Sequence, residues 1–138
     1  LKPFWLKEFV SFMARAGAND KDATWGGEEG VPGGDREWHF RNGDLTVRAY
    51  EDFVEGAIGG VVTAASVELT RFVAEVPPEH AWRGRLCVEL GSGCGLVSGA
   101  LVQLGARVVA TEQAQFLEHL RWNVQLNAGA AGCEGRCV

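Results

Sequence analysis

The chain has 138 residues, of which 46% are hydrophobic, and a formal net charge of −5. This is enough apolar material for one core of ordinary domain size. No apolar run approaches the roughly 20 residues that a membrane-spanning helix needs, and an acidic balance without a basic block argues against a nucleic-acid-binding surface.

Charged residues interrupt the apolar residues near the N-terminus, which excludes a secretory signal core. The cysteines do not have the spacing of a disulfide framework; they are Cys87, Cys94, Cys133 and Cys137. The last two lack the further ligands that a zinc site needs, so we expect no metal. We expect an intracellular, cytoplasmic protein that is a monomer.

The first 35 residues divide into two predicted segments. Aromatic and apolar residues recur at near-helical spacing from Phe4 to Met13, which predicts an amphipathic helix ending near Gly17. From Ala18 to Asp35 the chain is rich in glycine and acidic residues, which predicts a loop. We expect no chemistry from either segment.

A hairpin and a helix are predicted next. Residues 38–41 and 45–48 flank Asn42-Gly43, which is a strong hairpin signal. Apolar positions from Val61 to Val73 then mark a helix that Pro77 and Pro78 end.

A strand–helix–strand–helix series follows, over residues 85–90, 96–104, 107–111 and 114–127. Both strands are almost entirely apolar, which is typical of a parallel sheet buried on both faces by helices. We therefore expect an α/β fold, with a Rossmann-like parallel sheet and flanking helices, preceded by the N-terminal β-hairpin.

The series stops after too few strands to cover its helices, so we expect residues 1–138 to be one incomplete domain that lacks its C-terminal half. Residues 1–60 would contain the N-terminal helix, the loop and the hairpin. Residues 61–138 would form the cofactor-binding half.

A glycine-rich turn joins the first strand of this series to its helix. Gly91, Gly93 and Gly95 let the backbone turn sharply and let a ligand approach main-chain N–H groups at the positive end of the helix. Glu112 ends the second strand, 21 residues after Gly91, where its carboxylate can accept hydrogen bonds from both ribose hydroxyls of an adenosine. Together these features predict a site for an adenosine cofactor.

Two residues distinguish between adenosine cofactors. The dinucleotide fingerprint has its third glycine where this chain has Leu96, which argues against a nicotinamide cofactor. Glu89, just before the turn, would repel a pyrophosphate, but it suits the cationic ammonium and sulfonium groups of S-adenosylmethionine. We expect S-adenosylmethionine, with an NAD-linked oxidoreductase as the weaker alternative.

These residues resemble the seven-β-strand S-adenosylmethionine-dependent methyltransferases, and among them the small methyltransferase-like proteins that modify protein lysines. That family shows a hairpin, a Val-Val-Trp-Asp-Ala-Ala-like helix start, a Val-Glu-Leu-Gly-Ser/Ala-Gly-x-Gly-Leu-Val turn, a Val-x-x-Thr-Asp strand end and an Asn-Val-x-x-Asn helix. The counterparts of the last four here are residues 61–65, 88–97, 108–112 and 123–127, within a resemblance that covers roughly residues 38–128.

The resemblance implies transfer of a methyl group to a lysine of a protein substrate. It also implies that Gly91, Ser92 and Gly93 hold the methionine end of the cofactor, that Glu112 holds the ribose, and that Gln113 lies beside the adenosine. Thr63 occupies the position of a family tryptophan that contacts the cofactor.

The family's later strands, with an Asp-containing motif that faces the substrate, have no counterpart before Val138. We therefore expect this fragment alone to be inactive, and we name no catalytic residue. The alternative is a non-catalytic interaction module with a degenerate methyltransferase fold.

Overall fold

The computed structural model describes residues 37–52, 58–78, 80–131 and 136–137. The helix predicted over residues 4–13, the loop predicted after it, and Cys133 lie outside these ranges. The elements in chain order are β1 (Glu37–Asn42), β2 (Leu45–Tyr50), α2 (Ala64–Glu75), β3 (Leu86–Leu90), α3 (Leu96–Gln103), β4 (Arg107–Thr111), the 3-10 helix η1 (Ala114–Phe116), α4 (Leu117–Ala131) and β5 (Arg136–Cys137). No helix within the described ranges is long and apolar enough to cross a membrane.

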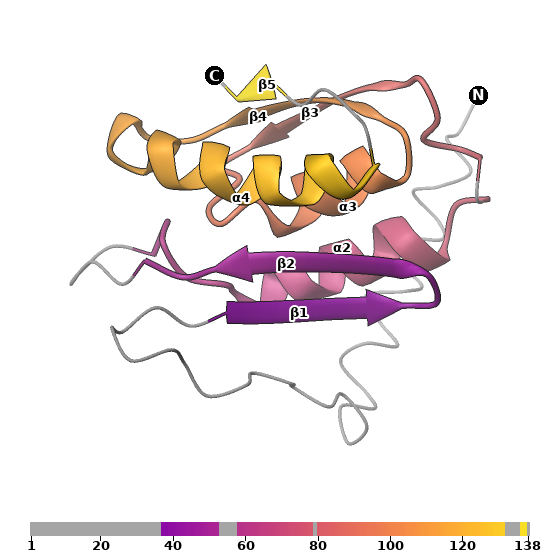
Figure 1. Ribbon diagram of the computed structural model, residues 1–138, viewed down its shortest axis with the longest axis horizontal. Coiled ribbons are helices and arrows are strands. Elements are labelled where there is room, and N and C mark those ends of the chain that lie inside the picture. Colours follow the sequence, from indigo (N-terminus) through magenta and orange to yellow (C-terminus); the bar gives the residue numbers. More distant parts are fainter. Residues whose placement is uncertain (1–36, 53–57, 79, 132–135, 138) are drawn as a thin grey trace.

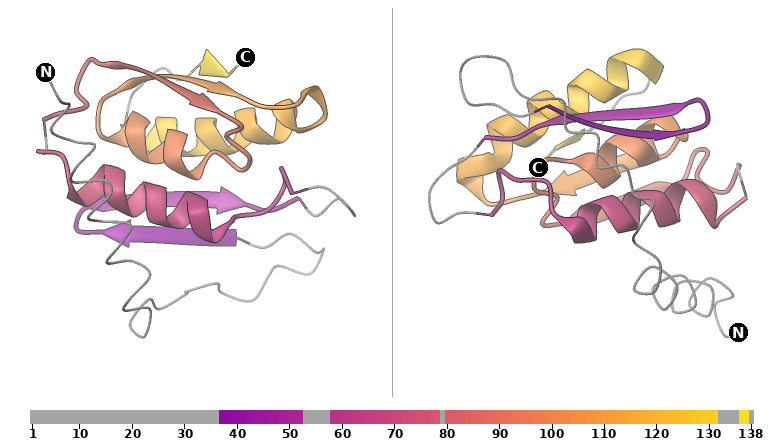
Figure 2. Two further views of the ribbon diagram at one scale, coloured as in Figure 1. Left: turned by 180° about the vertical axis from the view of Figure 1, so that it is seen from behind. Right: turned by 90° about the horizontal axis from the view of Figure 1, so that it is seen from below.

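The described elements form three layers (Figure 1). The sheet β3-β4-β5 lies on one side, the hairpin β1-β2 and α2 lie on the other, and α3 and α4 lie between them. Figure 2 shows the same order from behind, with the hairpin separate from the sheet. The predicted α/β fold with a preceding hairpin is confirmed.

The hairpin turn lies one residue later than the sequence predicts. Asn42 still pairs with Leu45, so Gly43 and Asp44 are the two central residues of the turn. Gly43 has a φ of 57°, and glycine at the first central position is typical of the type II′ turns that fit twisted hairpins.

The strands β3 and β4 are parallel, and their register runs from Leu86 opposite Arg107 to Leu90 opposite Thr111. The two-residue strand β5, which was not predicted, pairs with β4. Because the two longer strands are parallel and in register, their carboxyl ends meet at one edge of the sheet. The glycine turn directly follows β3 and Glu112 directly follows β4, so both lie at this edge.

The prediction that both strands are buried on both faces is wrong for β3. Leu86, Val88 and Leu90 are 63%, 59% and 81% exposed. The alternate residue Cys87 packs against the core instead. Both α3 and α4 lie on one side of the sheet, and no described helix covers the other side (Figure 1). The apolar sequence of β3 thus indicates that its side chains are suited to burial on both faces of the sheet. In the described structure only one of these faces is covered.

The helix α3 is the centre of the core. Every residue from Leu96 to Val102 is buried, as expected for a helix that is apolar on all sides. One apolar cluster packs α3 against α2, α4 and β4, and a second packs its N-terminal half against the hairpin.

Two side-chain amides attach the hairpin to α4. The Asn127 Oδ1 accepts the Arg48 N–H at 2.9 Å, and its Nδ2 donates to the Arg48 carbonyl oxygen at 2.7 Å. Asn123 makes the same two bonds with Tyr50, at 2.9 and 3.0 Å. Each amide thus takes the place of a peptide group in a neighbouring strand, which satisfies the outer edge of β2 without extending a sheet.

Candidate functional site

A cavity of about 760 Å³ lies where the carboxyl ends of β3 and β4 meet the start of α2. This volume is typical of small-molecule sites. Seven of the eight predicted cofactor-binding residues line it: Thr63, Glu89, Gly91, Ser92, Gly93, Glu112 and Gln113. The fold thus brings together residues from three separate segments of the chain.

The glycine turn is fastened to the sheet and leaves its backbone open to the cavity. The Ser92 N–H donates to the carbonyl oxygen of Thr111, the last residue of β4, at 2.9 Å. Gly91 and Gly93 have φ angles of +67° and +52°, a left-handed conformation that favours glycine. Apart from Gly91 itself and its two neighbours in the chain, no described heavy atom lies within 4 Å of a Cβ built on Gly91, so the turn has free space on that side.

Gly95 is the predicted residue that does not line the cavity. A Cβ built on it would lie 2.7 Å from the Leu120 Cδ1 and 3.1 Å from the Val124 Cγ2, and its φ is +73°. The missing side chain therefore lets the start of α3 pack closely against α4. A contact between Gly95 and a cofactor stays a prediction.

The Glu112 carboxylate joins the end of β4 to the glycine turn. Its Oε2 accepts the Gly93 N–H at 2.7 Å, and its Oε1 accepts the Gln113 N–H at 2.8 Å. Each carboxylate oxygen can still accept another hydrogen bond. The side chain therefore presents two fixed acceptors at the cavity wall, as the two hydroxyls of a ribose require.

Glu89 is a half-buried carboxylate at the end of β3. Burial raises its pKa, hydrogen bonds from Ser98 and Ser92 oppose this rise, and the Glu112 carboxylate adds to it. The Ser98 Oγ, from a fully buried residue of α3, donates to the Glu89 Oε2. Ser98 was not among the predicted site residues, although a hydroxyl within an otherwise apolar helix is a signal that a polar partner lies opposite.

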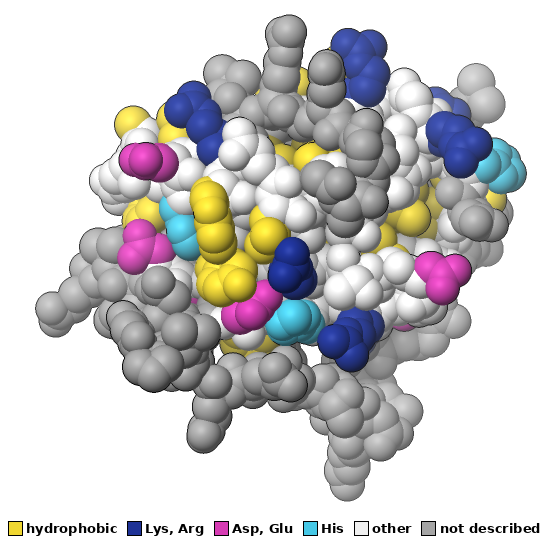
Figure 3. All heavy atoms as spheres, viewed as in Figure 1, with side chains coloured by type: hydrophobic (Ala, Val, Ile, Leu, Met, Phe, Trp, Pro, Cys, Tyr) yellow, Lys and Arg dark blue, Asp and Glu magenta, His cyan; other side chains and the backbone are white. Residues whose placement is uncertain are grey.

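The charge of the cavity is negative. Glu89 and Glu112 line it, and none of the described lining residues is Lys, Arg or His. The face of the molecule shown in Figure 3 differs from the cavity, because acidic and basic side chains are interspersed among the described residues there. Two carboxylates without a nearby cation favour a cationic ligand and disfavour a phosphate.

Thr63 lies at the cavity but caps α2. Its Oγ1 accepts the Ser66 N–H at 3.1 Å, and the Ser66 Oγ accepts the Thr63 N–H at 3.1 Å. This reciprocal pair is a capping box, which the Thr-x-x-Ser pattern could have indicated. The threonine thus has a local structural function that a tryptophan at this position would not perform.

Cys94 lies behind the turn as a buried free thiol. Burial raises its pKa to about 12, and the carboxylates of Glu51, Asp52 and Glu112 contribute to the rise. The thiol is therefore protonated at neutral pH, in agreement with a packing function. No group of three metal-ligating side chains occurs among the residues that the structure describes.

Two further residues near the cavity were not among the site residues predicted from the sequence. Phe116 of η1 is buried against Gly59, where a Cβ would lie 2.6 Å from its ring. Glu51 is only 8% exposed, and its Oε1 accepts the Val62 N–H at 2.7 Å. No spacing or motif in the sequence marks either residue, because their partners are distant in the chain or lie in an irregular segment.

Comparisons with known proteins agree with this geometry. A family model described as lysine methyltransferase matches residues 41–134. The chain is 34% identical over 88 residues to the protein N-lysine methyltransferase METTL21A of Mus musculus, which covers 64% of this chain and 39% of the relative. It is 28% identical over 90 residues to the protein-lysine methyltransferase METTL21E of Mus musculus and to that of Bos taurus, covering 65% of this chain and 35% and 30% of the relatives. The chain thus spans 39% or less of the length of these relatives.

Proposed function

Because the chain belongs to the lysine methyltransferase family of S-adenosylmethionine-dependent enzymes, we propose that the intact protein methylates a lysine side chain of another protein. One observation carries the proposal for this chain. The glycine turn opens into a cavity that has two carboxylates and, among its described lining residues, no cationic side chain. Such a lining suits a cofactor that carries positive charge and no phosphate.

The residues present fit S-adenosylmethionine. When bound, this cofactor supplies a methyl group that its positively charged sulfur has already activated. Glu112 would accept hydrogen bonds from the ribose hydroxyls, and the space beside Gly91 would admit the methionine end close to the backbone. Glu89 would place a negative charge near the cationic groups.

The acceptor side needs alignment more than acid–base chemistry. A lysine amine reacts in its neutral form, and the donor is already activated, so holding the two groups in line supplies much of the rate. We therefore assign no general base to this chain.

Isothermal titration of the folded chain with S-adenosylmethionine and with NAD tests the cofactor proposal. We expect S-adenosylmethionine to bind and NAD not to bind. Glu112→Ala should weaken binding at least about tenfold, because it removes charged acceptors for two hydroxyls. Gln125→Ala, on the exposed side of α4, is the matched control and should bind like the wild type.

A folded chain without measurable binding of S-adenosylmethionine would refute the cofactor proposal and favour the non-catalytic module. Binding of NAD instead would favour the oxidoreductase.

The lysine acceptor is tested separately with the intact protein. Incubation with methyl-labelled S-adenosylmethionine and a protein mixture, followed by mass spectrometry, should locate the label on lysine nitrogen. Label on arginine or on small molecules would contradict the proposal. A cytoplasmic location and a monomeric state stay predictions.

A further inference from the structure

The segment of residues 58–63, which we call the 58–63 wall, lines one side of the cavity through Ile58, Gly59, Val61 and Thr63. This wall contacts two other parts of the cavity lining, the glycine turn and Phe116 of η1. A Cβ on Gly93 of the glycine turn would lie 3.4 Å from the Gly59 carbonyl oxygen, and a Cβ on Gly59 would lie 2.6 Å from the Phe116 ring. A displacement of the wall would therefore change the width of the cavity.

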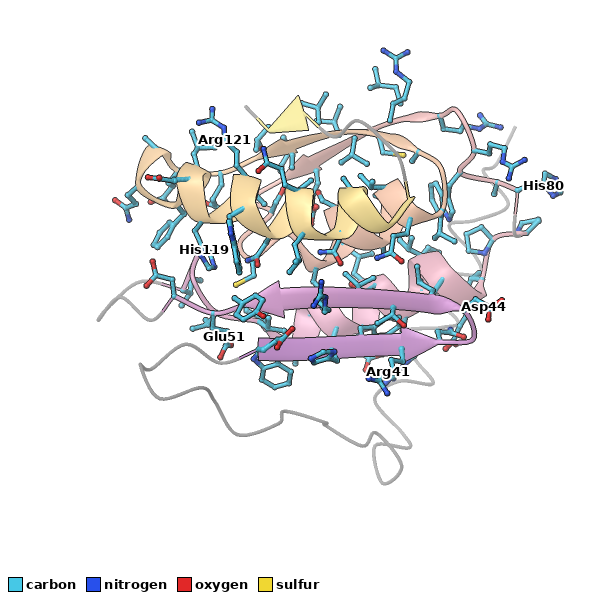
Figure 4. All side chains as sticks on the ribbon, in the orientation of Figure 1. Arg41, Asp44, Glu51, His80, His119 and Arg121 are labelled. Atoms are coloured by element: carbon cyan, nitrogen blue, oxygen red, sulfur yellow. The ribbon has the colours of Figure 1, made fainter. Side chains whose placement is uncertain are left out.

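The end of the hairpin holds this wall through two contacts. The Glu51 Oε1 accepts the Val62 N–H at 2.7 Å, and the Asp52 N–H donates to the Gly60 carbonyl oxygen at 2.9 Å. A Cβ on Gly60 would lie only 1.9 Å from the Asp52 carbonyl oxygen, so only glycine permits this approach. Figure 4 labels Glu51 just beyond the end of β2.

The helix α4 fixes the backbone from which Glu51 extends. Tyr50 directly precedes Glu51, and both of its outward backbone groups bond to the Asn123 amide. The Tyr50 ring also packs edge-to-face on Trp122, with 4.7 Å between the ring centroids. A continuous set of contacts thus runs from α4 through the hairpin to the 58–63 wall.

We infer that Glu51 is a positioning residue that holds the 58–63 wall at the separation from the glycine turn that cofactor binding requires. The inference rests on the proposed function. The Val62 N–H lies just before the helix cap, outside any helix or sheet ladder, and would be unsatisfied without this acceptor. An oxygen at this reach is needed, whereas a negative charge is not. Glutamine at position 51 should therefore still accept the Val62 N–H, whereas the shorter aspartate should not reach it.

Titration of the full chain with S-adenosylmethionine separates reach from charge. We expect Glu51→Gln to bind within about twofold of the wild type, and Glu51→Asp to bind about tenfold more weakly, because an unmade bond to a partly buried N–H weakens the wall. Val73→Ala, in the core face of α2, is the matched control, since it should lower the melting temperature without changing the affinity. Wild-type affinity in Glu51→Asp, or lost affinity in Glu51→Gln, would overturn the inference.

Hydrogen exchange at the Val62 amide provides a readout without a cofactor. Exchange should be slow in the wild type and in Glu51→Gln, and fast in Glu51→Asp. Fast exchange in the wild type would overturn the inference even if Glu51→Asp does not fold. If the wild type protects this amide but binds no S-adenosylmethionine, the proposed function fails, and with it the link between the wall and that cofactor.

Discussion

Replacing Asn127 with leucine should detach part of the hairpin from α4. Asn127 is 2% exposed, and each hydrogen-bonding position of its amide is occupied. The Oδ1 accepts from the Arg48 N–H and the Gln103 Nε2, and the Nδ2 donates to the carbonyl oxygens of Arg48 and Asn123. Leucine has a similar volume and none of these groups, so the substitution tests the hydrogen bonds more than the packing.

The expected loss of stability follows from the backbone groups that lose their hydrogen-bond partners. The Arg48 N–H and carbonyl oxygen become unsatisfied, at about 1–3 kcal/mol each. Gln103 keeps its bond to the Thr46 carbonyl oxygen. Burial of the leucine methyl groups offsets about 1 kcal/mol. The free energy of unfolding should therefore fall by about 3 kcal/mol, a large share of the roughly 5–15 kcal/mol of an ordinary domain.

Urea unfolding, followed by circular dichroism and tryptophan fluorescence, measures this change. For a slope of about 2 kcal/mol per molar urea, the midpoint should move by about 1.5 M. Gln125→Leu, at an exposed position of the same helix, is the matched control and should change stability by less than about 0.5 kcal/mol. Equal stability of Asn127→Leu and the wild type, or equal losses in both variants, would refute the reasoning.

Three further predictions concern the glycine turn and its neighbours. Gly95→Ala should lower the free energy of unfolding by about 3 kcal/mol, and Gly91→Ala by only about 1 kcal/mol. Both glycines have a positive φ, but only at Gly95 would the added methyl group meet Leu120. Equal losses for the two variants in urea unfolding would contradict this prediction. Cys94, with a pKa of about 12, should resist iodoacetamide at pH 8 in the folded chain and react after unfolding, as mapped by mass spectrometry; labelling of the native chain would show that the thiol is accessible and ionised. The raised pKa of Glu89 means that the folded state holds this proton more tightly than the unfolded chain, so the stabilising contribution, complete below the ordinary pKa of 4.5, is lost as the pH rises through the folded-state pKa. Glu89→Gln should therefore have a higher melting temperature than the wild type at pH 7 and bind S-adenosylmethionine more weakly. A lower melting temperature of this variant at pH 7 would contradict the conclusion that burial raises the pKa of Glu89.

Local patterns in the sequence predict much of the fold and the candidate site. The Asn-Gly signal, the apolar periodicity and the paired prolines indicate the hairpin, strands and helices because neighbouring residues determine turns, caps and amphipathic faces. The site residues could be placed together for a related reason. The carboxyl ends of neighbouring parallel strands meet at one edge of a sheet, so the turn after Leu90 and the residue after Thr111 must lie close to each other.

Only the tertiary structure distinguishes residues that look alike in the sequence. Gly91 and Gly95 share one turn, but Gly91 has open space beside it whereas Gly95 packs against α4. The apolar side chains of β3 alternate between a covered face and an exposed face because both neighbouring helices lie on one side of the sheet.

The sequence by itself determined the order of the hairpin, the two longer parallel strands and the helices between and around them, as well as the glycine turn and the acid that follows the second strand, because these depend on residues close together in the chain. The tertiary structure decided that Asn127 holds Arg48, 79 residues away, and that Glu51 holds Val62 at the cavity wall. The physical reason is that a polar side chain has many possible partners in an extended chain. Packing around α3 leaves Asn127 within reach of the N–H and the carbonyl oxygen of Arg48, and Glu51 within reach of the Val62 N–H.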